Sequence, residues 1–271
     1  MRSYVLFSLL IFITAKVVAQ PPLPYSKHTT VVIAHRGDHV LVPENTVAAC
    51  KKAITHGVDY VEVDLRTTKD GELVLMHNAT VDHMTNGKGA VKDLTFAAIR
   101  QLAVKPRLEA DKNVYRVPTF KEVLAACKGK IHIYLDFKDA DVAKTYALIK
   151  AAGMERSVIV YINAEEQLKQ WQQIAPQMPL MCSLPETVKD AASLQAFIRT
   201  AKVAALDGDH RQYTPEMLAA AKAAKVAVWL DVQEKEEGPA QWDPALQLKV
   251  DGMQTDHPEI LVKYLQKKGR R

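Results

Sequence analysis

The sequence of 271 residues has little cysteine: Cys50, Cys127 and Cys182 are far apart, and each lies in an apolar segment. Three widely spaced cysteines do not indicate a disulfide framework or a zinc site, so we expect small buried core residues, although a secreted protein could pair two of them. Long runs of Lys and Arg are also missing, and the formal net charge is only +5. This balance does not indicate a nucleic-acid partner, and none is expected.

The chain has no internal repeat, low-complexity tract or linker that would divide it. Its N-terminus differs from the rest: Arg2 precedes a mostly apolar run over residues 4–15, and small residues follow at 17–19. This pattern predicts a signal peptide over residues 1–19, with an uncleaved anchor as the alternative. We therefore expect a secreted or periplasmic protein with one domain over residues 20–271 and no stable membrane span after cleavage, because the apolar run is too short for one. Removing Arg2 and Lys16 lowers the net charge from +5 to +3.

Short apolar strands alternate with helices along the remaining chain. Eight strands are expected near residues 31, 60, 131, 158, 180, 203, 226 and 252. Such an alternation predicts an α/β fold, a (β/α)₈ TIM barrel, with an open doubly wound sheet as the alternative. Asn45 is expected to cap the first helix. Residues 79–118 are irregular and too long for an ordinary connection, so we predict a small cap insertion there.

The segment from Tyr60 to Asn78 carries the strongest chemical signal. Glu62 and Asp64 are two residues apart in an otherwise apolar strand, so both carboxylates point to one face. The following Lys69-Asp70-Gly71 predicts a hairpin, whose second strand returns antiparallel and ends at His77. Burying two adjacent acids is costly unless a cation neutralises them. The alternative is an edge hairpin whose acids are solvated.

Polar residues follow the first three expected barrel strands, and in a TIM barrel such residues converge on one mouth. They are His35, Arg36, Glu62, Asp64, Asp136 and Lys138, together with His77 after the hairpin. Three carboxylates suit a hard divalent cation such as Mg²⁺ or Ca²⁺. An Arg and a Lys beside them suit a phosphate, and two histidines can act as acid and base.

The motifs of this chain, and the order in which they occur, resemble those of the glycerophosphodiester phosphodiesterases. The likeness is clearest over residues 31–102 and continues more thinly to the C-terminus. The matching pieces are Ala34-His35-Arg36-Gly37, Pro43-Glu44-Asn45-Thr46, Glu62-Val63-Asp64, Met76-His77, Leu135-Asp136-Phe137-Lys138 and Thr255-Asp256-His257-Pro258. The resemblance implies a barrel with a cap after the catalytic histidine. It also implies that the substrate is a small glycerophosphodiester, hydrolysed to sn-glycerol 3-phosphate and an alcohol.

The resemblance also implies a role for each site residue. His35 and His77 would form the acid/base pair, in an order that stays open. Glu62, Asp64 and Asp136 would bind the divalent cation, which is Mg²⁺ or Ca²⁺. Arg36 and Lys138 would bind the phosphate. Glu44 would orient Arg36 or contact the metal, and Trp229 would line the glycerol side.

Four positions depart from the family pattern. Asp136 stands where Glu is usual, Asn78 where Asp is common, His83 where Arg is common, and Leu230-Asp231 where Thr-Val is usual. These departures leave two alternatives open. One is phospholipase D- or C-like action on lysophospholipids or inositol lipids, and the other is a non-catalytic barrel that binds a phosphate ligand. The preferred alcohol and the oligomeric state stay open as well.

Overall fold

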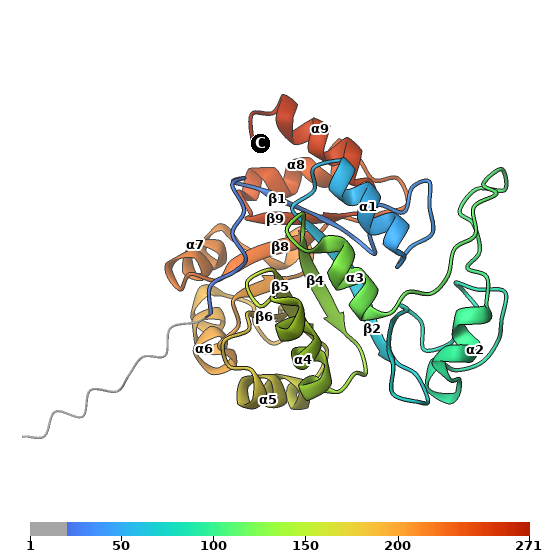
Figure 1. Ribbon diagram of the computed structural model, residues 1–271. Coiled ribbons are helices and arrows are strands. Elements are labelled where there is room, and N and C mark those ends of the chain that lie inside the picture. The colour runs from blue at the N-terminus through green and yellow to red at the C-terminus, as the bar shows by residue number, and fades with distance from the viewer. Residues whose placement is uncertain (1–20) are drawn as a thin grey trace, which may run out of the picture.

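The computed structural model describes residues 21–271, so the expected signal peptide over residues 1–19 lies outside the described residues. Eight parallel strands form the barrel (Figure 1): β1 (Val31–Ala34), β2 (Tyr60–Thr67), β4 (His132–Phe137), β5 (Val158–Ile162), β6 (Leu180–Ser183), β7 (Ala205–Asp207), β8 (Ala227–Asp231) and β9 (Gly252–Thr255). The helices are α1 (Val47–Thr55), α2 (Phe96–Gln101), α3 (Phe120–Cys127), α4 (Val142–Ala152), α5 (Glu165–Ile174), α6 (Ala191–Ala201), α7 (Pro215–Ala223), α8 (Pro239–Leu248) and α9 (Pro258–Lys267).

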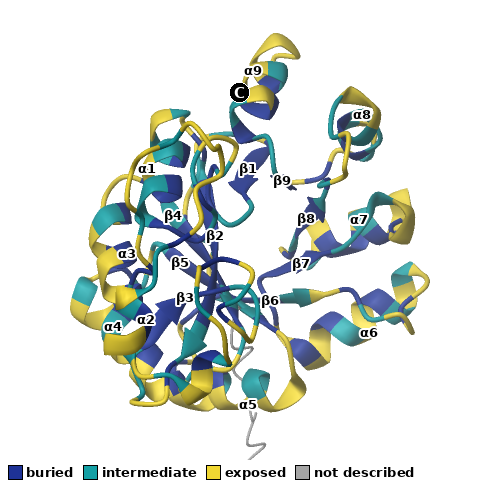
Figure 2. Cartoon of the chain, turned by 90° about the vertical axis from the view of Figure 1, so that its right-hand side faces the viewer, coloured by how far each residue is buried: buried dark blue, intermediate teal, exposed yellow. Residues whose placement is uncertain are grey.

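The sheet closes at its first strand. β1 pairs in parallel with β2 on one side and with β9 on the other, so that Ile33 lies opposite both Tyr60 and Gln254. All helices except α2 connect consecutive barrel strands or follow the last one, and they surround the buried strands (Figure 2). The predicted (β/α)₈ barrel is therefore confirmed, and the open doubly wound sheet is ruled out.

Alternating side chains separate two cores. On β2, Val61, Val63 and Leu65 point outward and pack in the layer between the strands and the helices. A smaller cluster fills the inside of the barrel: Val31, Ile33, Tyr60, Tyr134, Ile159, Met181, Ala205 and Trp229. This inner cluster is dense, because a Cβ on Gly252 would lie 2.5 Å from Val31 Cγ2 and 2.6 Å from Trp229 Cδ1.

The predicted hairpin is confirmed. β3 (Leu73–Leu75) runs antiparallel to β2, with Leu65 opposite Leu75 and Thr67 opposite Leu73. Glu62 and Asp64 are only 3% and 1% exposed, so the interpretation as an edge hairpin with solvated acids is wrong.

The first helix is capped one residue later than expected. Thr46 is the N-cap of α1, because its side chain accepts a hydrogen bond from the backbone N–H of Ala49. Asn45 instead has a left-handed backbone, with φ of 52°, and its side chain bonds to Asp64. The expectation that Asn45 caps the helix was wrong because a tertiary partner competes for its amide.

The chain between β3 and α3 forms the cap insertion. It contains a 3₁₀ turn, η1 (Val91–Asp93), and α2, and lies on the side of the barrel toward which β2 and β4 run (Figure 1). Its own apolar cluster comprises Val74, Met76, Val81, Met84, Val91, Ile99, Val104 and Val117. Among residues 21–271, no helix is long and apolar enough to cross a lipid bilayer.

Candidate active site

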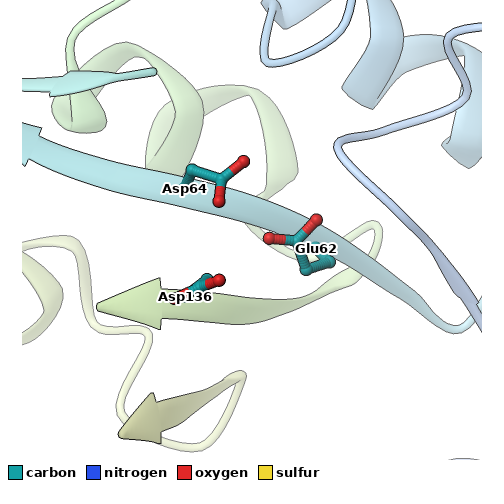
Figure 3. A group of neighbouring side chains, drawn as sticks. All are labelled: Glu62, Asp64 and Asp136. Atoms are coloured by element: carbon teal, nitrogen blue, oxygen red, sulfur yellow. The ribbon is translucent and has the colours of Figure 1, made fainter. Parts of the chain in front are cut away.

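Three carboxylates meet on the same face of two neighbouring strands, in the middle of β2 and near the C-terminal end of β4. Glu62 and Asp64 lie on β2 and Asp136 on β4 (Figure 3), and one oxygen from each lies within 4.8 Å of the others. The register explains this, because Asp64 lies directly opposite Asp136 in the parallel pair and Glu62 is two residues earlier on the same face. The sequence therefore predicted correctly that these three side chains converge.

Burial and mutual repulsion make this cluster costly without a cation. Burial raises the pKa of Glu62 well above its usual value, and the charges of Asp64 and Asp136 raise it further. Burial and the charge of Asp64 also raise the pKa of Asp136, although Lys138 opposes this shift. The charged form of Glu62 is therefore disfavoured in the cluster, and a divalent cation would favour it.

Lys138 lies between two of the carboxylates. Its ammonium group is 3.2 Å from Asp64 Oδ1 and donates a hydrogen bond to Asp136 Oδ2. Burial alone would lower the pKa of Lys138, but the two acids outweigh it and raise the pKa. The lysine is thus charged and held at the edge of the cluster.

Arg36 follows β1 and faces the cluster from the other side. Its backbone N–H donates to Glu62 Oε2 at 2.6 Å, which its left-handed backbone, with φ of 53°, permits. Its Nη1 donates to both oxygens of Glu44 at 3.1 and 3.2 Å. Its Nε lies 3.7 Å from Asp64 Oδ2 and is a buried donor without an acceptor. Of the two roles expected for Glu44, this geometry favours orienting Arg36.

His35 contacts an acid from the far end of the chain. Its Nδ1 lies 2.7 Å from Asp256 Oδ1, at the end of β9. His39 accompanies this pair, with its Nε2 3.6 Å from the same Asp256 oxygen. Burial would raise the pKa of Asp256, but the hydrogen bond with His35 and the nearby histidine charges lower it. The carboxylate is therefore ionised and orients the imidazole ring.

His77 follows the hairpin strand, beside the end of β2. Met76, the preceding residue, donates its backbone N–H to the Asp64 carbonyl at 3.0 Å. The ring Nδ1 of His77 lies 2.8 Å from Asn78 Oδ1, and its carbonyl accepts from Arg66 at 2.7 and 3.0 Å. Asn78 can take the place of the expected acid here, because its amide oxygen also accepts a hydrogen bond from an imidazole N–H.

Two further residues of the site were missed from the sequence. Asn45 donates to Asp64 Oδ2 at 2.7 Å and accepts from the Asp64 backbone N–H at 3.0 Å. Asn163, directly after β5, donates to Asp136 Oδ1 at 2.7 Å. Its position directly after the fourth barrel strand was a usable signal, but polar residues were collected only after the first three strands.

Trp229 lies deeper than expected. It is the central residue of β8 and not at the strand's end, and its ring centroid lies 4.8 Å from that of Tyr60 and 6.4 Å from that of Tyr134. The indole therefore belongs to the inner cluster below the polar mouth. A role on the glycerol side stays a prediction.

Comparisons with known proteins agree with this geometry. The model of the glycerophosphoryl diester phosphodiesterase family matches residues 35–260. A glycerophosphodiester phosphodiesterase of Caldanaerobacter subterraneus subsp. tengcongensis is 32% identical over 253 residues, which cover 89% of this chain and 99% of the relative. Glycerophosphodiester phosphodiesterase 1 of Homo sapiens is 38% identical over 151 residues, which cover 52% of this chain and 46% of the relative.

Solved structures give the same result. The crystal structure of a glycerophosphodiester phosphodiesterase from Agrobacterium tumefaciens matches with a TM-score of 0.76 and 27% identity, over 86% of this chain and 99% of that one. A phosphodiesterase of Oleispira antarctica in complex with the product sn-glycerol-3-phosphate shares the fold, with a TM-score of 0.72 at 18% identity, over 88% and 97% of the two chains. The chain belongs to the glycerophosphoryl diester phosphodiesterase family and is an enzyme with the diester hydrolase activity for which that family is named.

Proposed function

We propose that the enzyme hydrolyses small glycerophosphodiesters to sn-glycerol 3-phosphate and an alcohol, with a divalent cation held by Glu62, Asp64 and Asp136. The observation that carries the proposal is the convergence of these three carboxylates within 4.8 Å at the barrel mouth. An all-oxygen donor set suits Mg²⁺ or Ca²⁺. When bound, such an ion supplies stabilisation of the negative charge that develops on the non-bridging phosphate oxygens.

Arg36 and Lys138 bind the phosphate in this proposal. The unpaired Nε of Arg36 is a buried donor in need of an acceptor, which a phosphate oxygen provides. Lys138 already contacts Asp64 and Asp136, so an anion next to these acids lies within reach of its ammonium group. Glu44 keeps the guanidinium in place through Nη1.

His35 and His77 transfer the protons. In each ring Nδ1 is engaged, by Asp256 or by Asn78, and Nε2 remains for the reaction. One histidine takes a proton from the attacking water or the neighbouring glycerol hydroxyl as the new P–O bond forms; after attack by the hydroxyl, water opens the resulting cyclic phosphate to give sn-glycerol 3-phosphate. The other gives a proton to the alcohol oxygen as the old P–O bond breaks, and each transfer contributes about 10²- to 10⁴-fold in rate. The assignment of acid and base between the two stays open.

The test is release of sn-glycerol 3-phosphate from glycerophosphocholine, before and after treatment with EDTA. We expect EDTA to abolish release and either Mg²⁺ or Ca²⁺ to restore it. If the protein binds glycerophosphodiesters but hydrolyses none of them with any divalent cation, it is instead a non-catalytic phosphate-binding barrel.

A second candidate function is action on lysophospholipids. A cavity of about 750 Å³ adjoins Asn163, and much of its lining is apolar: Ile162, Ala164, Leu168, Cys182, Pro185 and Phe197. Because Asn163 contacts Asp136, an acyl chain in this cavity would lie near the carboxylate cluster. A higher kcat/KM on lysophosphatidylcholine than on glycerophosphocholine would favour this function, and no turnover of the lysophospholipid would exclude it.

We also propose that residues 1–19 direct export. The protein recovered from the periplasm or the medium of the producing cell should then begin at Gln20. An intact N-terminus in the cytoplasm would contradict this.

A further inference from the structure

A second pair of acids, of which Asp207 is buried and Asp231 half-buried, lies at the same mouth. Asp207 is the last residue of β7 and Asp231 the last residue of β8, and Gln254 lies beside them on β9. Neither acid belongs to the carboxylate cluster of Glu62, Asp64 and Asp136, and neither takes part in the proposed reaction. Among residues 21–271, no Lys, Arg or His side chain forms an ion pair with either carboxylate; the nearby Arg211 pairs with Asp209 instead.

Two acceptor atoms beside this pair have no donor. Asp207 is only 5% exposed, and its Oδ1 accepts no hydrogen bond. Gln254 is 8% exposed, and its Oε1 likewise has no partner. The Gln254 amide is fixed at the acids, because its Nε2 donates to Asp231 Oδ1 at 2.9 Å. Leaving such buried acceptors unsatisfied destabilises the protein, so a donor from a ligand would stabilise them.

The electrostatics at this position favour a cation. Burial raises the pKa of Asp207 to about 6, although the neighbouring hydroxyls of Ser183 and Tyr134 oppose this shift. Burial and the charge of Asp207 raise the pKa of Asp231 to about 8. A positive charge between the two would remove the repulsion and allow both to ionise.

The acid pair faces the proposed phosphate site across the barrel. Tyr134 lies on β4, two residues before Asp136, and its hydroxyl is 3.4 Å from Asp207 Oδ2. In the other direction around the barrel, β9 and β1 lie between β8 and β2, and His35 directly follows β1. A substrate with its phosphate at the first cluster therefore has the acid pair opposite that phosphate. The ring of Tyr134 lies beneath Asp207, and aromatic faces also attract cations.

We propose that Asp207, Asp231 and Gln254 bind a primary ammonium group on the alcohol part of the substrate. This inference rests on the proposed function, since it concerns the leaving group of that reaction. A primary ammonium has three N–H donors, which match the two unpaired acceptors and the Asp231 carboxylate. A trimethylammonium group has the charge but no donor, and a polyol has donors but no charge.

The test compares three substrates that differ only in the alcohol: glycerophosphoethanolamine, glycerophosphocholine and glycerophosphoglycerol. We expect the wild-type kcat/KM to be highest for the ethanolamine diester. Asp231→Asn should lower this value at least tenfold, lower the value for the choline diester less, and change the value for the uncharged glycerophosphoglycerol less than twofold. The same variant should weaken binding of glycerophosphoethanolamine, measured by calorimetry with the catalytically impaired His77→Ala background.

Controls separate this inference from the proposed function and from misfolding. Glu216→Gln removes an exposed acid of α7 and should leave all three values unchanged. Gln254→Leu removes one acceptor without changing the charge, and should also reduce the ethanolamine preference even if Asp231→Asn does not fold. Equal losses on all three substrates, or no wild-type preference for the ethanolamine diester, would overturn the inference while leaving the proposed hydrolysis intact. Absence of hydrolysis together with unchanged binding in Asp231→Asn would overturn both.

Discussion

Asn45 illustrates how one residue supports a site without touching the substrate. Its amide holds both the carboxylate and the backbone of Asp64, so it fixes the orientation of that side chain. Groups of this kind typically change metal affinity by about 10- to 100-fold. Asn45→Ala should therefore weaken Mg²⁺ or Ca²⁺ binding by about that factor in calorimetric titrations. Asn113→Ala, an exposed amide in the cap insertion, should have no effect, and equal affinities of the two variants would contradict the role of Asn45.

His77 and His83 offer a direct comparison between a proposed catalytic histidine and an exposed one. His77→Ala should lower kcat by about 10²- to 10⁴-fold, the usual contribution of a general acid or base. Metal affinity should be retained, because the imidazole is not among the three carboxylate ligands. His83→Ala should keep kcat within twofold. Undiminished turnover in His77→Ala would remove this histidine from the mechanism.

The raised pKa values of Asp207 and Asp231 make the stability of the protein depend on pH. In the folded chain Asp207 and Asp231 keep their protons to pKa values of about 6 and 8, whereas the unfolded chain loses them near the ordinary value of about 4. Between these limits the folded state binds more protons, so the free energy of unfolding falls as the pH rises from about 4 to about 8.

The Asp231→Asn variant tests this relation. Asn cannot ionise, so the variant should gain stability relative to the wild type as the pH rises from 5 to 8. The gain should reach about 1 kcal/mol or more, since one pKa unit corresponds to about 1.4 kcal/mol. Urea denaturation at several pH values measures it. Glu216→Gln should show no such trend, because the pKa of this exposed acid is lowered and it is ionised throughout the range.

At the scale of strands and helices, Gly252 makes a specific prediction. A methyl group there meets Val31 and Trp229 at 2.5–2.6 Å, at the start of β9 where β1 and β8 pair with it. Gly252→Ala should destabilise the protein by about 1–3 kcal/mol, as overpacking of a dense core does. Gly238→Ala is the matched control, because nothing lies within 4 Å of its added Cβ. Equal midpoints of thermal unfolding for the two variants would contradict the close packing inside the barrel.

The composition of the strands explains why most of the fold was predictable from the sequence. Continuous apolar strands that end in Gly, Pro or polar residues gave all eight barrel positions, because both faces of a parallel strand are buried. Asp207 was missed for a related reason: the apolar run ends at Leu206, so the pattern does not mark Asp207 as the last residue of β7. The cap insertion has no regular periodicity, so apart from the family resemblance only its length indicated it.

The candidate site was predictable only where neighbouring strands supply it. Glu62, Asp64 and Asp136 follow from spacing and from the pairing of β2 with β4. The contact of Asp256 with His35 joins residues far apart in the chain, and no local pattern encodes it. Asn45 has a strong local preference for helix caps, which a buried tertiary partner overrides.

For the whole molecule, cation binding should couple to unfolding. A ligand at 100 times its Kd stabilises the folded state by about 2.7 kcal/mol. Saturating Mg²⁺ or Ca²⁺ should therefore raise the midpoint of thermal unfolding, and EDTA should reverse the shift. The shift should shrink as the pH falls, because the raised pKa of Glu62 lets protons compete with the cation. Glu62→Gln should show a smaller shift with less pH dependence, and an unchanged shift would place the cation elsewhere.

The meeting of β1 with β9 has a consequence for synthesis of the protein. His35 emerges from the ribosome early, whereas Asp256 and the strand before it emerge almost last. A nascent chain that already contains Glu62, Asp64, His77 and Asp136 therefore still has an open barrel and an unoriented His35. Enzyme activity should therefore arise only after the complete chain is released, when the last strand completes the ring.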